Sequence, residues 1–547
     1  MSGEAVLGDG RVRPDWTMTH LVRARARERG RRVFATFEGR ASLTFASLDR
    51  ESDRFAAALA ACGVGPGERV MALLGNGPEI LVAFFGAMKA GALIVPINTE
   101  LRGAFLAHQV DNAAPAMVVA EGGLLQAFDG IEGPAPGRLA IVGGEMPVAL
   151  PGLFAESAVS TFETFLAAGD GNPVPETAAR PGDIGAILYT SGTTGPSKGV
   201  LLPHGHLFLM SAATARATGL TAGDLYYVAM PLFHINALCA QTIAALTVGA
   251  QVHIVRRFSP NRWLDEVIAC GATHTNLLGV MPEFLFNTPP TPRDRDHRLR
   301  VTLAVPIGPW GREFEARFGL RILQGFGMTE CGMPFWCPLS EPVEPGCAGY
   351  ISEQWFEACV VDPETDMPLP AGEVGELLVR PKMPGCFSVG YYRMPERTVE
   401  AWRNFWFHTG DAARFDERGR LHYVDRLKDC IRRRGENISA FEVEQVLNAH
   451  PEIAESAVVG VRVEGAGGEE EVLAVLLPEN GARLDPVELL DWCVPRMPRY
   501  AVPRFVDFAD GFEKTASGKL RKGDLRDAGL PPGAWDREEA GYTIARQ

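Results

Sequence analysis

The chain lacks the features that would direct it to nucleic acid or to an oxidising compartment. Its net charge is −14, whereas non-specific binding to nucleic acid or to an anionic membrane needs a basic face. Its ten cysteines include no Cys-x-x-Cys pair, which argues against a zinc or disulfide scaffold and favours reduced thiols. We therefore expect no nucleic-acid partner, although a local cluster of positive charge can still hold an anionic ligand.

Long apolar runs are also missing. Ile80–Ala87, one of the longest, is far shorter than the ~20 residues that cross a bilayer. The first residues contain no apolar segment of the kind found in signal peptides. We therefore expect a soluble, cytoplasmic protein without stable membrane insertion, and we leave open whether it forms a homodimer.

What the chain does have is a clear alternation of strand and helix patterns. In residues 42–98, apolar side chains recur at helical spacing and a glycine follows that can end the helix (Phe45, Leu48, Phe55, Leu59, Cys62 and Gly63). A strand at 70–74, a helix at about 79–90 and a strand at 93–96 come next. This rhythm predicts a mainly parallel sheet covered by helices. Residues 126–182 are rich in Gly, Pro and Ala, and we interpret them as a surface connection.

The pattern changes near Asp425. A charged hairpin at 429–434, helices at about 441–449 and 486–494, and strands at 455–461 and 471–477 indicate an α+β unit of ordinary domain size. We predict an α/β domain over residues 1–424 and a small α+β domain over 425–547. The last fifteen residues show no periodicity, and we expect a loose tail there.

The strongest local signal is the loop Tyr189–Val200, which lies between apolar strands at 184–188 and 200–202. Five hydroxyl residues, three glycines and a lysine share this loop, and such a set of donors suits a phosphate chain. A polar surface turn is the alternative. The loop differs from the common GxxxxGK[ST] phosphate loop, because Ser197 precedes Lys198 and Gly199 follows it.

The loop resembles the phosphate loop of the adenylate-forming superfamily, which includes acyl-CoA synthetases, adenylation domains and firefly-type luciferases. Further motifs of that superfamily follow in order over about residues 20–525. They resemble its aromatic/His segment, its adenine and magnesium segment, its ribose motif, its hinge, the segment after the hinge and its catalytic lysine motif: Pro231–His234, Gly325–Glu330, His408–Asp411, Asp425–Lys428, Gly435–Ile438 and Thr515–Lys519.

The resemblance implies an ATP-dependent acid–CoA ligase that forms AMP. Such an enzyme converts a small carboxylic acid and ATP to acyl-AMP and pyrophosphate, and then makes acyl-CoA. It uses ATP, Mg²⁺ and coenzyme A, and its small C-terminal domain is mobile and rotates about the hinge between the two steps. Three alternatives remain open: a stand-alone adenylation enzyme that loads a carrier-protein pantetheine, a luciferase-type oxidase, and a non-catalytic homologue.

The resemblance also assigns roles residue by residue. For ATP and AMP it implies Thr190, Ser191, Gly192, Thr193, Thr194, Gly195, Lys198, Gln324, Gly325, Phe326, Gly327, Asp411 and Arg426. For catalysis it implies Lys519, Thr329, Glu330 and His234, with Glu330 and Thr194 as metal ligands. Lys428 is the hinge candidate. Arg433, Arg434 and Gly435 are the candidates for coenzyme A, and His234, Asn236, Val305, Ile307 and Met333 for the acyl pocket.

Each assignment has a physical reason and a plainer alternative. A carboxylate such as Glu330 offers the hard oxygen that Mg²⁺ prefers, and Lys519 offers a cation where a carboxylate meets a polyphosphate. His234 and Phe326 could instead be core residues. The Gly410-Asp411 pair could be an ordinary turn, and Arg432–Arg434 could be a solvated face.

Two stretches depart from the superfamily pattern. Many relatives have Gly-Gly-Ala-Pro where this chain has Leu303–Gly308, so Val305 and Ile307 are expected to reshape the acyl cleft. Crotonobetaine/carnitine–CoA ligases depart there too, and this chain is similar to them. The last motif usually has Pro where this chain has Glu513, which we expect to bring a negative charge near Lys519.

Overall fold

The computed structural model describes the chain except residues 1–6, 8–10, 144–145, 176–177, 191–196, 428–429, 434–435, 464–469, 480–481, 483, 498–500, 515–519 and 545–547. The chain divides into two compact units. The first comprises Met1–Glu357 and Arg380–Phe407, and the second comprises Ala358–Val379 and His408–Gln547. Among the described helices, none has the length and apolarity that a membrane crossing needs. The functional boundary at 424/425 remains a prediction.

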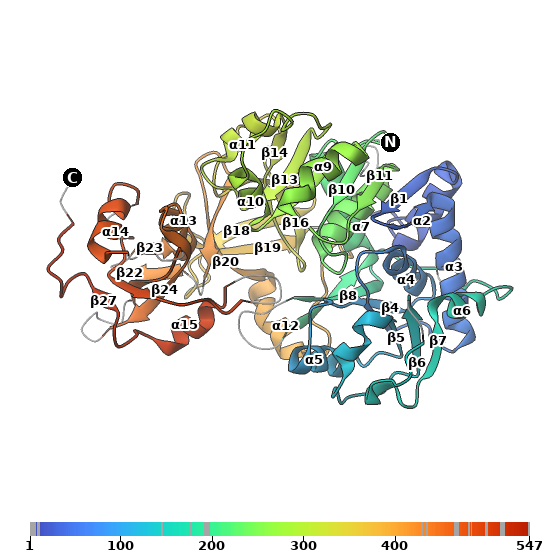
Figure 1. The fold of residues 1–547 in the computed structure, drawn as a ribbon. Coiled ribbons are helices and arrows are strands. Elements are labelled where there is room, and N and C mark those ends of the chain that lie inside the picture. Colours follow the sequence, from blue (N-terminus) through green and yellow to red (C-terminus); the bar gives the residue numbers. More distant parts are fainter. Residues whose placement is uncertain are drawn as a thin grey trace. The chain divides into compact units, whose positions relative to one another are not determined.

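The first unit contains two seven-stranded sheets with the same plan (Figure 1). In each, all neighbouring strands run parallel except one antiparallel pair at an edge, β8–β9 or β1–β2. One sheet has the order β7-β6-β5-β3-β4-β8-β9: Ala158–Thr161, Arg138–Val142, Met117–Glu121, Arg69–Leu73, Leu93–Pro96, Ile184–Thr190 and Lys198–Pro203. The other has the order β14-β13-β12-β10-β11-β1-β2: Arg321–Leu323, Val301–Val305, His274–Leu278, Leu225–Val228, Gln251–Ile254, Val33–Phe37 and Arg40–Thr44.

Helices pack on both sheets. The helix α4, for example, contacts β2 of one sheet and β3 and β4 of the other. The helices of this unit are α2 Met18–Arg29, α3 Phe45–Ala61, α4 Pro78–Lys89, α5 Gly103–Ala113, α6 Phe162–Ala167, α7 His204–Ala217, α8 Ala244–Val248, α9 Pro260–Cys270, α10 Met281–Asn287, α11 Gly311–Phe318 and α12 Pro395–Ala401. Short 3₁₀ segments are η1 Gly122–Phe128, η2 Gly152–Phe154 and η4 Arg403–Phe405, and η3 Asn236–Ile243 is a π-helix.

The predicted helix-covered, mainly parallel sheets are therefore confirmed, and so are the elements expected in residues 42–98. The interpretation of 126–182 as a surface connection is wrong. That stretch supplies β6, β7 and α6, which extend one edge of a sheet. Its strands are only four or five residues long and lie between Gly- and Pro-rich turns, so the turn composition concealed them.

The unit also contains an antiparallel meander, β15 Gly325–Met328, β16 Gly332–Trp336 and β17 Cys347–Ile351. The second unit carries the strands β18 Phe356–Val361, β19 Gly375–Pro381, β20 Phe407–Phe415 and β21 Leu421–Arg426, which neighbour one another in the order β18-β19-β20-β21.

The rest of the second unit is the expected α+β arrangement. It has the hairpin β22 Cys430–Arg433 and β23 Glu436–Ser439, the sheet β24 Ile453–Arg462, β25 Glu470–Pro478, β26 Phe505–Phe508 and β27 Trp535–Asp536, and the helices α13 Ala440–Asn448, α14 Pro486–Cys493 and α15 Lys522–Ala528. The expectation of a loose tail is wrong for its described part, because β27 pairs with β26 and the Tyr542 hydroxyl donates to Asp491 at 2.6 Å.

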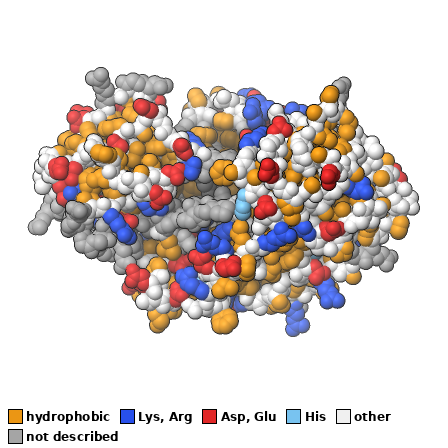
Figure 2. Space-filling view, turned by 90° about the horizontal axis from the view of Figure 1, so that it is seen from below, with side chains coloured by type: hydrophobic (Ala, Val, Ile, Leu, Met, Phe, Trp, Pro, Cys, Tyr) orange, Lys and Arg blue, Asp and Glu red, His pale blue; other side chains and the backbone are white. Residues whose placement is uncertain are grey.

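Figure 2 shows one face of the molecule, on which Lys and Arg side chains are interspersed with Asp and Glu side chains.

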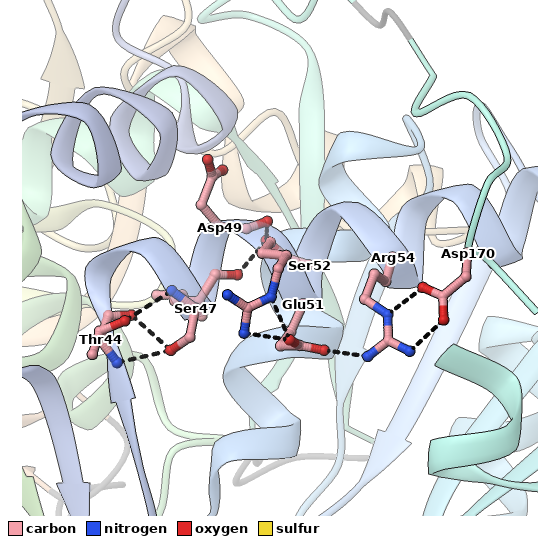
Figure 3. Close-up of polar contacts among 9 residues, drawn as sticks. Thr44, Ser47, Asp49, Glu51, Ser52, Arg54 and Asp170 are labelled. Atoms are coloured by element: carbon pink, nitrogen blue, oxygen red, sulfur yellow. Dashed lines mark hydrogen bonds and ion pairs between the residues drawn. The ribbon is translucent and has the colours of Figure 1, made fainter. Parts of the chain in front are cut away.

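The start of α3 shows how local sequence sets an element (Figure 3). The Thr44 hydroxyl accepts from the Ser47 N–H at 3.0 Å, and the Thr44 N–H donates to the Ser47 hydroxyl at 2.8 Å, so two groups at the helix start are satisfied reciprocally. Further along the helix, the Arg54 guanidinium donates to both carboxylate oxygens of Asp170, at 2.6 and 2.8 Å. These contacts fix the beginning of α3 and tie it to the chain after α6.

Thr44→Ala should lower the free energy of unfolding by about 1 kcal/mol, because it removes the side-chain acceptor at the start of α3. Urea unfolding of the full chain measures the change. Ser42→Ala, at an exposed position of β2, is the matched control and should change stability by much less. Equal effects of the two substitutions would contradict the capping role.

Candidate active site

The phosphate-loop candidate is closed at its base by an antiparallel strand pair. Thr190 of β8 lies opposite Lys198 of β9, and Ser191, Gly192, Thr193, Thr194 and Gly195 lie outside the described residues. Helix α5 holds the end of the loop, since the Gln109 amide donates to the Ser197 hydroxyl at 3.0 Å. The two strands thus fix where the loop leaves and re-enters the sheet.

A tyrosine connects this loop to the predicted magnesium carboxylate. The Lys198 ammonium donates to the Tyr391 hydroxyl at 3.3 Å and lies 4.4 Å from the centroid of its ring. The Tyr391 hydroxyl donates to Oε1 of Glu330 at 3.1 Å. Glu330 and Tyr391 are both buried, at 4% and 6% exposure. The structure therefore brings together Lys198 and Glu330, which sequence analysis assigned to one nucleotide site.

Sequence analysis missed Tyr391. An aromatic residue after a glycine, 61 positions from its partner Glu330, reads as ordinary core. The contact exists because residues 388–392 run along β9. The Leu201 N–H donates to the Gly390 carbonyl at 2.9 Å, the Tyr392 N–H donates to the Gly199 carbonyl at 2.7 Å, and the Ser388 N–H donates to the Glu330 carbonyl at 3.3 Å.

The Gly-Phe-Gly sequence of β15 has a packing explanation. A Cβ on Gly325 would lie 2.6 Å from the Phe335 carbonyl oxygen, and a Cβ on Gly327 would overlap the Gly332 carbonyl and the Met333 side chain. Both glycines are thus required by the close approach of β15 and β16. The Phe326 side chain is buried at 8% exposure and packs edge-to-face against Phe335.

Two of the predicted nucleotide residues, Phe326 and Gln324, also make contacts within the protein. The packing of Phe326 supports its alternative interpretation as a core residue. Gln324 is buried, its amide donates to the Glu344 carbonyl at 2.7 Å, and its carbonyl accepts from the Glu344 N–H at 2.9 Å. Both ends of this amide are used to hold the chain at Glu344, so the structure gives Gln324 a positioning role in the loop before β17.

The acyl-pocket candidates lie on three elements of the first unit. His234 is half-buried and precedes the π-helix η3, so the structure does not support a core histidine. Asn236 begins η3, and its carbonyl oxygen accepts from Asn276 at 2.9 Å and from Gln241 at 3.0 Å. Asn276 in turn accepts from the buried Tyr226 hydroxyl at 2.6 Å. A chain of amides therefore orients Asn236.

The other three acyl-pocket candidates differ in how exposed their side chains are. Val305 ends β13 opposite Leu278 of β12 and is partly exposed. Met333 of β16 is nearly buried and lies with His206 and Met210 of α7. Ile307 is buried at 4% exposure in an apolar cluster with Phe314 and Val343, so its side chain supports the packing of α11 and the structure gives it no exposed surface for an acid.

In the second unit, Asp411 and Arg426 are opposite each other on β20 and β21. The Arg426 Nε lies 3.0 Å from Oδ1 of Asp411, whose side chain is nearly inaccessible. The turn before Asp411 is held by Glu376, which accepts from the Gly410 N–H at 3.1 Å and lies 2.8 Å from Nδ1 of His408. Gly410 has φ +69°, a left-handed conformation that favours glycine.

The hinge candidate Lys428 and the coenzyme A candidates Arg434 and Gly435 lie outside the described residues. Arg433 is described. Its side chain is 3% exposed and its Nε lies 2.6 Å from Oε2 of Glu471 on β25. This buried ion pair does not fit the alternative of a solvated face, and the role of Arg433 toward coenzyme A stays a prediction.

Lys519 also lies outside the described residues, but its flanks are ordered. Lys514 and Leu520 form an antiparallel bridge, and the Arg521 N–H donates to the Glu513 carbonyl at 3.0 Å. The Glu513 carboxylate accepts from Arg521 at 2.9 Å. The unusual charge of Glu513 is therefore paired with Arg521.

Helix α15, which follows the Lys519 segment, is anchored by a buried pair. Lys522 donates to Glu444 of α13 at 2.7 Å, and the Val458 N–H donates to the other carboxylate oxygen at 2.6 Å. Burial raises the pKa of Glu444 to about 7, against the lowering effect of Lys522. The pair ties α15 to α13 within the second unit.

Comparison with known proteins agrees with this architecture. The AMP-binding enzyme family matches residues 22–392, and the AMP-binding enzyme C-terminal domain matches residues 442–519. Crotonobetaine/carnitine–CoA ligase of Salmonella typhi is 31% identical over 506 residues, which are 90% of this chain and 95% of that protein.

Solved structures show the same fold. ATP-bound MatB from Rhodopseudomonas palustris superposes with a TM-score of 0.78 at 27% identity, covering 93% of this chain and 98% of its own. A benzoate CoA ligase from Burkholderia xenovorans LB400 gives 0.78 at 25% identity, covering 93% and 99%.

The chain therefore belongs to the AMP-binding enzyme family. The predicted superfamily, the similarity to crotonobetaine/carnitine–CoA ligases and the predicted class of enzyme, an acyl-CoA synthetase that forms AMP, are confirmed.

Gly327→Ala should destabilise the protein by about 1–3 kcal/mol, because a methyl group has no room between β15 and β16 and the hairpin must shift. Urea unfolding of the full chain measures the loss. Gly65→Ala is the control, since a Cβ there meets no atom within 4 Å. A Gly327→Ala protein as stable as the Gly65→Ala protein would contradict the packing explanation for this glycine.

Proposed function

We propose that this protein is an AMP-forming acid–CoA ligase that activates a small carboxylic acid as its acyl-adenylate and passes the acyl group to coenzyme A. ATP and coenzyme A are its co-substrates, with Mg²⁺ as the metal. The observation that carries the proposal is the chain Lys198–Tyr391–Glu330, which places a phosphate-loop cation and a buried carboxylate around one hydroxyl. Membership of the AMP-binding enzyme family supports it independently.

The donor set fits magnesium. Glu330 supplies a carboxylate whose Oε1 is held by Tyr391, and carboxylate and hydroxyl oxygens are ligands that Mg²⁺ accepts. Glu330 would hold the ion together with Thr194, and Thr329 supports the same shell from the adjacent position. When bound, magnesium neutralises charge on the phosphates and helps to orient them.

In the first half-reaction the chain must bring a carboxylate to the α-phosphate of ATP. Thr190, Lys198 and the loop between them hold the phosphates, and Asp411 with Arg426 holds the ribose. His234 and Asn236 orient the acid, with Val305 and Met333 beside it. Lys519 neutralises the charge that accumulates where carboxylate and phosphate meet, and the acid oxygen then displaces pyrophosphate.

In the second half-reaction the thiol of coenzyme A attacks the acyl carbonyl and AMP leaves. We assign this step to the domain 425–547, which turns at Lys428 so that Gly435 replaces Lys519 beside the acyl group. Asp425 precedes the proposed hinge, and its two carboxylate oxygens accept from the Arg426 N–H and from the Phe441 N–H at the start of α13, a contact that the turn at Lys428 would have to break. It thereby joins the strand before the hinge to the helix after it.

The proposal also covers the chemical class of the acid, the acceptor of the acyl group, the cellular compartment and the quaternary state. The half-buried amide of Asn236 suits a small acid with a polar group, as in relatives that act on carnitine. Free coenzyme A is favoured over a carrier protein by the ligase relatives. We assign the activity to the cytoplasm, and a homodimer is the quaternary state to test by sedimentation. A panel of acids scored by pyrophosphate release identifies the substrate.

Lys519→Ala should reduce adenylate formation by roughly 10²–10³-fold or more, because one positioned charge is lost from the first half-reaction. Acyl-CoA formation from supplied acyl-adenylate should remain near the wild-type rate. Single-turnover measurements of the two half-reactions give both numbers. Lys514→Ala is the control, since Lys514 pairs with Glu455 at 2.8 Å. Equal losses in both half-reactions after Lys519→Ala would contradict the assignment.

Gly435→Leu should impair the second half-reaction and spare the first, the reverse of Lys519→Ala. A bulky side chain on the proposed coenzyme A path blocks the thiol while leaving the phosphate loop unchanged, so acid-dependent exchange of pyrophosphate into ATP should persist and acyl-CoA should fall to a small fraction of wild type. If the variant makes acyl-CoA at the wild-type rate, Gly435 does not line the coenzyme A path.

A further inference from the structure

Two groups of the proposed nucleotide site would neutralise each other if they met. Lys198 is a cation intended for phosphate, and Glu330 is an anion intended for magnesium. In a mostly buried setting, opposite charges attract strongly, and a direct pair would occupy both groups. Within the described residues the structure records no ion pair between Lys198 and Glu330, and instead one hydroxyl lies between them.

Tyr391 satisfies both charges at once. Its hydroxyl donates its hydrogen to Glu330 and accepts from Lys198, and its ring face lies 4.4 Å from the same ammonium. An ammonium over an aromatic face is stabilised without losing its charge. A tyrosine can therefore hold a lysine and a glutamate apart, whereas phenylalanine would leave the glutamate without a donor.

The backbone fixes the position of this hydroxyl. Tyr391 forms an antiparallel bridge with Val200, two residues after Lys198, and its N–H donates to the Thr398 hydroxyl at 2.9 Å. Gly390 has φ +129°, and a Cβ there would lie 2.5 Å from Cγ2 of Thr398. The residue before Tyr391 must therefore be glycine for the segment to follow β9 so closely. All of these residues belong to the first unit.

We propose that Tyr391 is a positioning residue that keeps Lys198 and Glu330 separate and aimed at Mg·ATP. The inference rests on the proposed role of Lys198 and Glu330 in holding Mg·ATP. When Mg·ATP enters, phosphate replaces the hydroxyl as the partner of Lys198 and the ion becomes a partner of Glu330, so neither charged group must first break an ion pair. Tyr391 acts on ATP binding through these two residues and touches neither the acid nor coenzyme A.

The test is the affinity for Mg·ATP, measured by isothermal titration calorimetry on the full chain without acid, so that no turnover occurs. Tyr391→Phe keeps the ring and removes the hydroxyl. It should raise the Kd for Mg·ATP by about tenfold, since hydrogen bonds to charged groups are among the stronger ones, and raise the magnesium concentration needed for half-maximal binding. The melting temperature should fall modestly, because the buried Glu330 carboxylate loses its donor, whereas the KM values for acid and coenzyme A should stay close to wild type.

Tyr392→Phe is the matched control. The neighbouring ring packs on the apolar core of the first unit and lies beside Arg393, so this variant should bind Mg·ATP like wild type. Tyr391→Leu removes ring and hydroxyl and should weaken binding more than Tyr391→Phe.

A double substitution separates positioning from packing. If Tyr391 acts through Glu330, then Tyr391→Phe should add little to the loss already caused by Glu330→Gln, because residues that act as one unit are not additive. Independent, additive losses would overturn the proposal. So would a Tyr391→Phe protein whose Kd for Mg·ATP lies within twofold of wild type, or one that loses melting temperature and all three substrate affinities together.

The same titrations distinguish this inference from the function it rests on. If Glu330→Gln and Lys198→Ala weaken Mg·ATP binding and Tyr391→Phe does not, the nucleotide site stands and the role of Tyr391 is wrong. If neither Glu330→Gln nor Lys198→Ala changes the Kd, the proposed site itself is wrong and the role of Tyr391 falls with it.

Discussion

A cation and a carboxylate from distant parts of the first unit, Lys198 and Glu330, share one partner, the hydroxyl of Tyr391. The cation, Lys198, comes from the edge strand β9, and the carboxylate, Glu330, comes from the turn between β15 and β16. The segment 388–392 reaches both, because it pairs with β9 and also donates a backbone hydrogen bond to the Glu330 carbonyl. The side-chain contacts of Tyr391 therefore follow from backbone pairing, which is the more rigid of the two kinds of contact.

The glycines of this region illustrate a second constraint. A glycine-rich motif next to a nucleotide site is naturally attributed to the ligand, yet Gly325 and Gly327 are required by the opposite strand of their own hairpin. Because β16 lies so close, the turn between the strands is short, and Glu330 is held in it at 4% exposure. Packing and function share the same residues here, so the motif alone does not separate the two.

Much of the fold could be predicted from the sequence, because local patterns determine it. The run from Phe45 to Pro96 shows clean helical and strand periodicity, and the structure has its elements where the pattern predicts them. The strands β6 and β7 were missed because they are short and flanked by turn residues. The order of the described residues from 533 to 544 was missed because it comes from long-range contacts, such as that of Tyr542 with Asp491.

The residues of the candidate site also differ in whether the sequence could predict them. Motifs predicted Lys198, Glu330 and Asp411 as candidates, since charged residues in a recognisable order carry chemical information. They did not identify Tyr391, whose partners are brought to it only by folding. They also could not show that Arg433 is paired with Glu471, that both ends of the Gln324 amide are used by Glu344, or that Ile307 belongs to the core. A sequence shows a residue type and its neighbours along the chain, whereas each of these outcomes depends on a partner that is distant in sequence.

Two loops carry most of the proposed chemistry, and in each of them an antiparallel strand contact joins the residues at its two ends. The loop after Thr190 is closed where Thr190 lies opposite Lys198, and the loop before Leu520 is closed by the bridge from Lys514. Joining the ends of a short loop removes much of its conformational freedom before any ligand arrives. A strand contact at each base therefore fixes where the chain leaves for the loop and where it returns, which lowers the entropy that ligand binding must still remove.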